Sequence, residues 1–211
     1  MARKRVATLI SGRGSNMVAL IEAAKDQTYP AEIALVVSNE PAAEGLNRAA
    51  AEGIRTAVVD HRKFGKDREA FERALQDELQ THKIQLACLA GFLRLLTPWF
   101  VRQWDGRLLN IHPALLPAFK GLDTHARAIA AGATQHGATV HFVMPEMDSG
   151  PIIAQAAVAV QSGDTEAALA ARVLEVEHRI YPQALRWVAE GRVRIADGRC
   201  LIDGQPAATF S

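Results

Sequence analysis

The sequence predicts a single α/β domain in three layers, with a parallel sheet in its first half that helices cover on both faces. Short apolar runs alternate with segments of helical spacing from residue 5 to residue 91, and the links between them are short. This alternation is typical of βαβ units, whose parallel strands are buried on both faces. The chain has 211 residues, 49% of them hydrophobic, and shows no internal repeat or linker. We therefore expect one domain over 1–211, with halves at 1–105 and 106–211 that share a sheet.

The first half reads as four strands separated by three helices. Apolar runs predict strands at 5–11, 31–39, 55–60 and 84–91, and helical spacing predicts helices at 15–25, 43–53 and 67–83. Ser15 or Asn16 is the expected N-cap of the first helix, and Gly53 the expected end of the second. This half is Rossmann-like in its order of elements.

The second half is less regular. We expect strands at 107–112, 137–143 and 151–160, of which the last two can pair antiparallel across the turn 144–150. A loop rich in proline and glycine fills 113–124, and helices follow at 125–132 and 164–191. Asp164 or Thr165 can cap the long helix, and Pro182 should kink or break it. The tail 192–206 reads as a small hairpin across Asp197-Gly198.

Composition excludes several classes of function. The net charge of +1 gives no reason to expect a nucleic-acid partner or an anionic membrane surface. No stretch approaches the roughly 18 apolar residues of a membrane span, and the basic start lacks the long apolar region of a signal peptide. Cys88 and Cys200 have no CxxC neighbour, so Cys88 is expected to pack as a small apolar residue. A reducing cytoplasm is the default location.

A glycine loop, "ISGRGSNM", joins the first strand to the first helix. Gly12 and Gly14 permit close backbone approach, and backbone N–H groups at a helix start suit a phosphate. Met17 stands where the dinucleotide fingerprint needs a third small residue, so a phosphate monoester is the better candidate. Arg13 and Ser15 could add donors. A tight βα turn without a ligand remains the alternative.

The stretch "LLNIHP" ends a predicted strand with two polar side chains. Residues two apart face the same side of a strand, so Asn110 and His112 project together near its carboxyl end. An amide can stabilise an oxyanion, and an imidazole can exchange protons near neutral pH. Asp148, in the turn "PEMDSGPI", could orient the His112 ring and stabilise its cation. Singly, each has an ordinary structural alternative: a strand-end amide, a core histidine and a turn aspartate.

Taken in order, the motifs resemble the phosphoribosylglycinamide formyltransferase family within the folate-dependent formyltransferases. The resemblance covers nearly the whole chain and rests on "ISGRGSN", "LAGFLRLL", "LNIHPALLPAFKG", "HGATVHFV" and "MDSGPII". It implies a mixed seven-stranded sheet. It also implies formyl transfer from 10-formyltetrahydrofolate to the amine of glycinamide ribonucleotide, a step of de novo purine synthesis, in a cytoplasmic monomer or homodimer that needs no metal.

The resemblance also assigns residues. It implies that Asn110, His112 and Asp148 are catalytic, through a tetrahedral intermediate whose oxyanion Asn110 and protonated His112 stabilise. The nucleotide-side residues it implies are Gly12, Arg13, Gly14, Ser15, Asn16 and Glu177. The folate-side residues it implies are Arg68, Leu93, Arg94, Leu95, Leu96, Asn110, Met144, Pro145, Glu146, Met147 and Asp148. Arg13 stands where many members have Asn or Ser.

Three other functions remain open at this point. A formyltetrahydrofolate hydrolase or a methionyl-tRNA formyltransferase would use the same motifs, although these enzymes usually carry a further domain. A nicotinamide-dependent oxidoreductase is disfavoured by Met17. A nucleotide-binding module without catalysis would leave Asn110, His112 and Asp148 unexplained.

Overall fold

The computed structural model describes residues 2–210. It is a mixed α/β fold with a central, mostly parallel sheet flanked by helices, as the sequence predicts. The chain divides into two compact units, Met1–Asn110 and Ile111–Ser211. That boundary lies a few residues beyond the expected one, and the expectation of a single domain stays a prediction. Among the described residues, no helix is long and apolar enough to cross a membrane.

The first unit carries five parallel strands in the order β5-β4-β1-β2-β3. They are β1 (Lys4–Ile10), β2 (Ala31–Ser38), β3 (Thr56–Val58), β4 (Leu86–Leu89) and β5 (Leu108–His112), the last of which ends two residues into the second unit. The strands β1, β2 and β4 are almost wholly buried, as expected for a parallel sheet covered on both faces.

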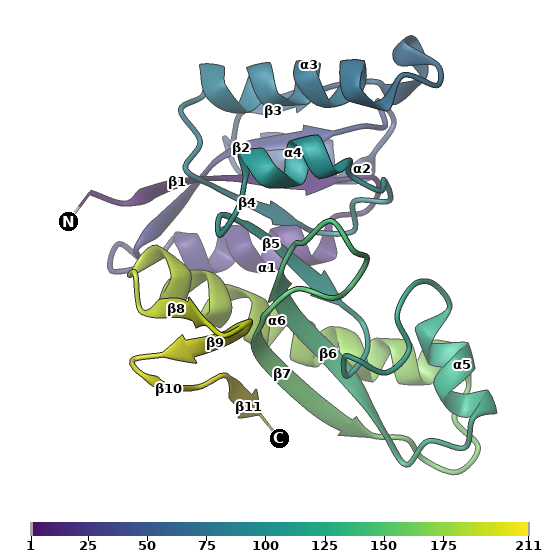
Figure 1. Ribbon diagram of the computed structural model, residues 1–211. Coiled ribbons are helices and arrows are strands. Elements are labelled where there is room, and N and C mark those ends of the chain that lie inside the picture. Colours follow the sequence, from purple (N-terminus) through teal and green to yellow (C-terminus); the bar gives the residue numbers. More distant parts are fainter. Residues whose placement is uncertain (1, 211) are drawn as a thin grey trace. The chain divides into compact units, whose positions relative to one another are not determined.

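Four α-helices connect these strands: α1 (Ser15–Ala24), α2 (Glu44–Ala51), α3 (Arg68–Thr81) and α4 (Pro98–Gln103), with a short 3₁₀ turn at His61–Phe64. The chain runs from β1 outward to β3 and then returns to β4 on the other side of β1. Because parallel crossovers are right-handed, this reversal places α1 and α3 on opposite faces of the sheet, and Figure 1 shows them so. The carboxyl ends of β1 and β4 therefore form a topological switch point, where ligands bind in open α/β sheets.

The second unit contains β6 (Gln135–Phe142), β7 (Ile152–Ala159) and the 24-residue helix α6 (Glu166–Ala189), which packs against both strands. The antiparallel pairing of β6 with β7 confirms the expected pair. A short helix, α5 (Thr124–Ala130), precedes β6. The tail forms the expected hairpin of β8 (Val193–Ala196) and β9 (Arg199–Ile202), followed by β10 (Gln205–Pro206) and β11 (Ala208–Phe210).

Several predictions of detail were wrong. The central sheet has eight strands rather than seven, because β11 pairs in parallel with β7 after the hairpin. Helix α6 continues through Pro182, so the proline does not break it, while the alternative of a kink stays a prediction. The N-cap of α1 is Gly14, in the left-handed conformation and without a side-chain cap, rather than Ser15 or Asn16. Helix α4 was missed, although Thr97 caps it and Pro98 occupies its first turn.

Candidate active site

The glycine loop follows β1 directly, and backbone contacts hold it in place. Gly14 has φ 68°, and a Cβ added there would lie 3.1 Å from the Met17 Cε and 3.4 Å from the Gly45 Cα. Met17 is fully buried, so it packs under the loop instead of leaving the gap that a third glycine would give. The Gly45 N–H donates to the Gly12 carbonyl at 3.0 Å. The loop is thus a tight βα turn, and Arg13 at its tip is exposed.

Ser11 ties this loop to the segment that follows β4. Its N–H donates to the Gly91 carbonyl at 3.0 Å, and its hydroxyl accepts from the Leu93 N–H at 2.8 Å. The same hydroxyl donates to the Asn39 Oδ1 at 2.5 Å. Ser11 and Asn39 were not singled out from the sequence. Because the loops after β1 and β4 meet here, the predicted nucleotide loop and the predicted folate segment lie side by side in the first unit.

The segment Leu93–Leu96 presents apolar side chains outward. Leu93 is 75% exposed and Leu95, two residues on, is 65% exposed, so this short segment presents two apolar side chains to solvent. Arg68, at the start of α3, donates from Nη2 to the Leu95 carbonyl. The Arg94 guanidinium lies 5.6 Å from the centre of the Phe71 ring. The structure therefore brings Arg68 together with the predicted folate segment, as a support of its backbone.

In the second unit, His112 and Asp148 lie together, as the sequence predicts. Asp148 Oδ2 is 3.4 Å from His112 Nδ1, and both side chains are at least nine-tenths buried. Asp148 Oδ2 also accepts from the Gly121 N–H at 2.9 Å. His112 Nε2 is 3.0 Å from the Phe119 carbonyl. Both ring nitrogens thus face oxygen acceptors, and only the imidazolium offers a donor to each.

His141 also lies near this pair, although the sequence alone predicts for it only a structural or supporting role. Its Nε2 lies 3.9 Å from Asp148 Oδ1, and its Nδ1 is 2.8 Å from the Phe142 carbonyl. Burial lowers the pKa of His141, against the opposing effects of that carbonyl and of Asp148. The lowered pKa favours the neutral form of His141, which competes less with His112 for Asp148.

The loop that carries Asp148 has a demanding backbone. Asp148 itself has φ 49°, in the left-handed region that Asp tolerates better than most residues. A Cβ at Gly150 would lie 1.8 Å from the Phe142 carbonyl oxygen, so only glycine fits there. The other predicted folate residues of this loop, Met144, Pro145, Glu146 and Met147, are exposed.

The remaining predicted residues are placed as follows. Asn110 is half-buried on β5, two residues before His112, so the two side chains leave the same side of that strand. Glu177 is 7% exposed on α6, so it is not a solvated charge on the helix surface. Asn16 is buried in the first turn of α1. The described residues contain no group of three or more His, Cys, Asp or Glu side chains that could hold a metal.

A buried imidazole beside a carboxylate, on the strand that also carries an amide, suits proton transfer and oxyanion stabilisation. The formyl transferase family matches residues 4–185. The chain is 44% identical over 200 residues to the phosphoribosylglycinamide formyltransferase of Escherichia coli K12, covering 95% of this chain and 94% of that protein. The chain belongs to the formyl transferase family. Within it, the chain groups with the phosphoribosylglycinamide formyltransferases.

Comparison with solved structures supports the same family. The phosphoribosylglycinamide formyltransferase of Coxiella burnetii superposes with a TM-score of 0.93 at 40% identity, covering 99% of this chain and all of that one. The chain is also 49% identical over 193 residues to the chicken trifunctional purine biosynthetic protein adenosine-3, covering 92% of this chain. It spans about a fifth of that protein, 19% of its length.

Proposed function

We propose that the chain transfers the formyl group of 10-formyltetrahydrofolate to the amine of glycinamide ribonucleotide. The products are formylglycinamide ribonucleotide and tetrahydrofolate. The observation that carries this proposal is the buried His112–Asp148 pair at 3.4 Å, directly after the Asn110 of β5, in a chain of this family. The proposal places the reaction in de novo purine synthesis and in the cytoplasm. The buried thiols of Cys88 and Cys200 are compatible with a reducing compartment.

The proposal assigns residues to each of the two substrates. In the first unit, the loop Gly12–Asn16 receives the phosphate of the ribonucleotide through backbone N–H groups and the start of α1. The exposed segment Leu93–Leu96 and Arg68 serve the folate. In the second unit, the loop that ends at Asp148 serves the folate, and Glu177 serves the glycinamide end.

The proposed chemistry is direct transfer without a covalent enzyme intermediate. The neutral amine attacks the formyl carbon, and the carbonyl electron pair moves onto oxygen. The Asn110 amide and the protonated His112 donate to that oxyanion. In the structure the His112 Nε2 faces the Phe119 carbonyl, so the oxyanion competes for this proton. Asp148 stabilises the imidazolium. As the intermediate collapses, the carbon–N10 bond breaks, and one proton passes from the attacking nitrogen to N10.

The test is turnover with defined substrates. Purified protein with 10-formyltetrahydrofolate is followed by folate absorbance, with and without glycinamide ribonucleotide. We expect tetrahydrofolate to form only when the ribonucleotide is present, together with one formylated ribonucleotide per folate consumed. Formate released without the ribonucleotide would show a formyltetrahydrofolate hydrolase instead, and consumption of NAD(H) would show an oxidoreductase.

A further inference from the structure

Helix α3 carries three polar side chains at intervals of four residues, all of which contact the chain between β4 and β5. Arg68 donates to the Leu95 carbonyl, Glu72 accepts from Thr97, and the Gln76 Oε1 accepts from the Trp104 indole N–H at 2.7 Å. Residues four apart lie on one face of a helix. This face is therefore hydrogen-bonded, at three successive turns, to the Leu93–Leu96 segment and to the two cap residues of α4.

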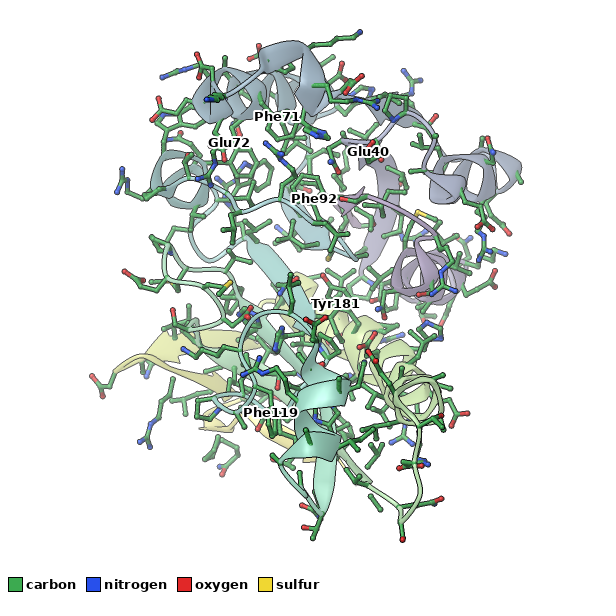
Figure 2. All side chains as sticks on the ribbon, turned by 90° about the vertical axis from the view of Figure 1, so that its right-hand side faces the viewer. Glu40, Phe71, Glu72, Phe92, Phe119 and Tyr181 are labelled. Carbon is green, nitrogen blue, oxygen red and sulfur yellow. The ribbon has the colours of Figure 1, made fainter. Side chains whose placement is uncertain are left out.

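Glu72 is the most constrained of the three. It is 1% exposed, and a buried carboxylate is tolerated only when its oxygens are hydrogen-bonded. Its Oε1 accepts from the Thr97 N–H at 2.6 Å, and its Oε2 accepts from the Thr97 hydroxyl. Both oxygens thus converge on one residue. Figure 2 labels Glu72 on α3 beside Phe71.

Thr97 is the residue at which the exposed segment ends. Its hydroxyl also accepts from the Phe100 N–H at 3.4 Å, as the N-cap of α4. The same segment is held at its start by the Leu93 N–H on the Ser11 hydroxyl and in its middle by Arg68 on the Leu95 carbonyl. Hydrogen bonds thereby hold the backbone at Leu93, Leu95 and Thr97, while the side chains of the two leucines remain exposed.

We propose that Glu72 is a positioning residue for the folate co-substrate. Its carboxylate fixes Thr97 and so holds Leu93–Leu96 in the conformation that receives the folate before the folate arrives. The inference rests on the proposed function, because that function assigns this segment to folate. A residue that orders a binding segment in advance raises the affinity for the ligand of that segment. Without such a residue, the free energy of ordering the segment would reduce the free energy of binding.

The test replaces Glu72 by Gln, which keeps the size of the side chain but loses the charge and one acceptor. Charge-assisted hydrogen bonds are among the stronger ones, so we expect the KM for 10-formyltetrahydrofolate to rise roughly tenfold. The KM for glycinamide ribonucleotide should stay within about twofold, and kcat at saturating folate within about threefold. The same rise should appear in the Kd of tetrahydrofolate, measured by titration calorimetry.

A second variant and a control keep the inference open to refutation. Thr97→Val removes the hydroxyl but keeps the N–H, and should also raise the KM for folate. The double variant should be less than additive, because both changes remove the same contact. Glu69→Gln is the matched control: it lies on α3 with its side chain 56% exposed, 3.7 Å from Arg73, and should change neither KM.

The outcomes separate this inference from the proposed function. A wild-type protein that binds tetrahydrofolate but does not formylate the ribonucleotide would refute the function, and the Kd comparison would still decide the role of Glu72. If Glu72→Gln and Thr97→Val lower the melting temperature and leave both the KM and the Kd for folate unchanged, Glu72 is merely structural. Equal increases in both KM values, or wild-type protein that binds no tetrahydrofolate, would also overturn the inference.

Discussion

Replacing Asp148 by Asn isolates the charge of the carboxylate from its shape. The Asn carbonyl can take the place of the Oδ2 that accepts from the Gly121 N–H at 2.9 Å. Asn also tolerates the left-handed φ of 49° at this position at least as well as Asp. Asp148→Ala would instead combine loss of charge with backbone strain. We therefore expect Asp148→Asn to fold normally and to lose activity because the His112 cation loses its partner.

The magnitude follows from the distance between the two groups. At 3.4 Å, the attraction between an imidazolium and a carboxylate is about 5 kcal/mol at an effective dielectric constant of roughly 20. The Asn dipole retains part of this attraction, so a loss of about 3–4 kcal/mol is reasonable for a pair of this kind. Since about 1.4 kcal/mol corresponds to tenfold in rate, kcat should fall by roughly 10²–10³.

The assay is steady-state kinetics with each substrate varied in turn across neutral pH. An effect on the transition state lowers kcat and leaves both KM values nearly unchanged. Asp197→Asn is a matched control, because Asp197 also has a left-handed φ, 50°, but lies exposed in the turn between β8 and β9. If Asp148→Asn retained kcat within about threefold of the wild type over this pH range, the proposed coupling of Asp148 to His112 would be wrong.

Three further predictions concern other parts of the chain. A Cβ at Gly12 meets nothing within 4 Å, so Gly12→Ala should unfold at the melting temperature of the wild type and yet have a higher KM for the ribonucleotide. Gly14→Ala should raise the same KM. Because Gly14 has a left-handed φ, this variant should also lose about 1–2 kcal/mol in its free energy of unfolding, measured in urea. Burial lowers the pKa of His136 from 6.5 to about 4. Between these values the unfolded chain binds a proton that the folded chain does not, so this group makes the protein less stable as the pH falls. His136→Phe should therefore remove about 2 kcal/mol from the loss of stability between pH 7 and pH 5, measured by unfolding at both pH values. Burial raises the pKa of the Cys200 thiol to about 12, which disfavours the reactive thiolate. Iodoacetamide at neutral pH should therefore label Cys200 only in unfolded protein, and mass spectrometry would detect the label.

The parts of the fold that the sequence predicted are those encoded by local periodicity. Alternating apolar runs located β1, β2 and β4, and the period of two along β5 placed Asn110 and His112 on one side of a strand. Helix α4 was not predicted, because its six residues are too few to show a helical period. Helix α6 passes through Pro182 because tertiary packing on β6 and β7 outweighs the local cost of proline.

The contacts around the candidate site could not be predicted from local periodicity, because they join residues far apart in the sequence. Ser11 and Asn39 are 28 residues apart, and Glu72 and Thr97 are 25 residues apart. Such pairs meet only because β2 pairs with β1, which brings the carboxyl ends of these strands together, and because the crossover helix α3 packs beside α4. Glu72 lies in an amphipathic helix whose other carboxylates face solvent, so its sequence context gave no sign of burial. The resemblance to a family could assign roles to Arg68 and Asp148, but not the groups that hold them.

The backbone around Asp148 argues that the position of its carboxylate is what this loop is built to maintain. A non-glycine residue at φ 49° is held at a cost of roughly 1–2 kcal/mol, and it persists only where its surroundings fix it. Here the Gly121 N–H fixes the carboxylate, and the contact of Gly150 with the Phe142 carbonyl fixes the returning chain. Asp197 has the same left-handed φ in the exposed turn between β8 and β9, so the buried contacts of Asp148 with Gly121 and His112, and not its φ alone, distinguish this loop. Retaining this conformation is understandable if the charge must stand beside His112 when the ring becomes a cation.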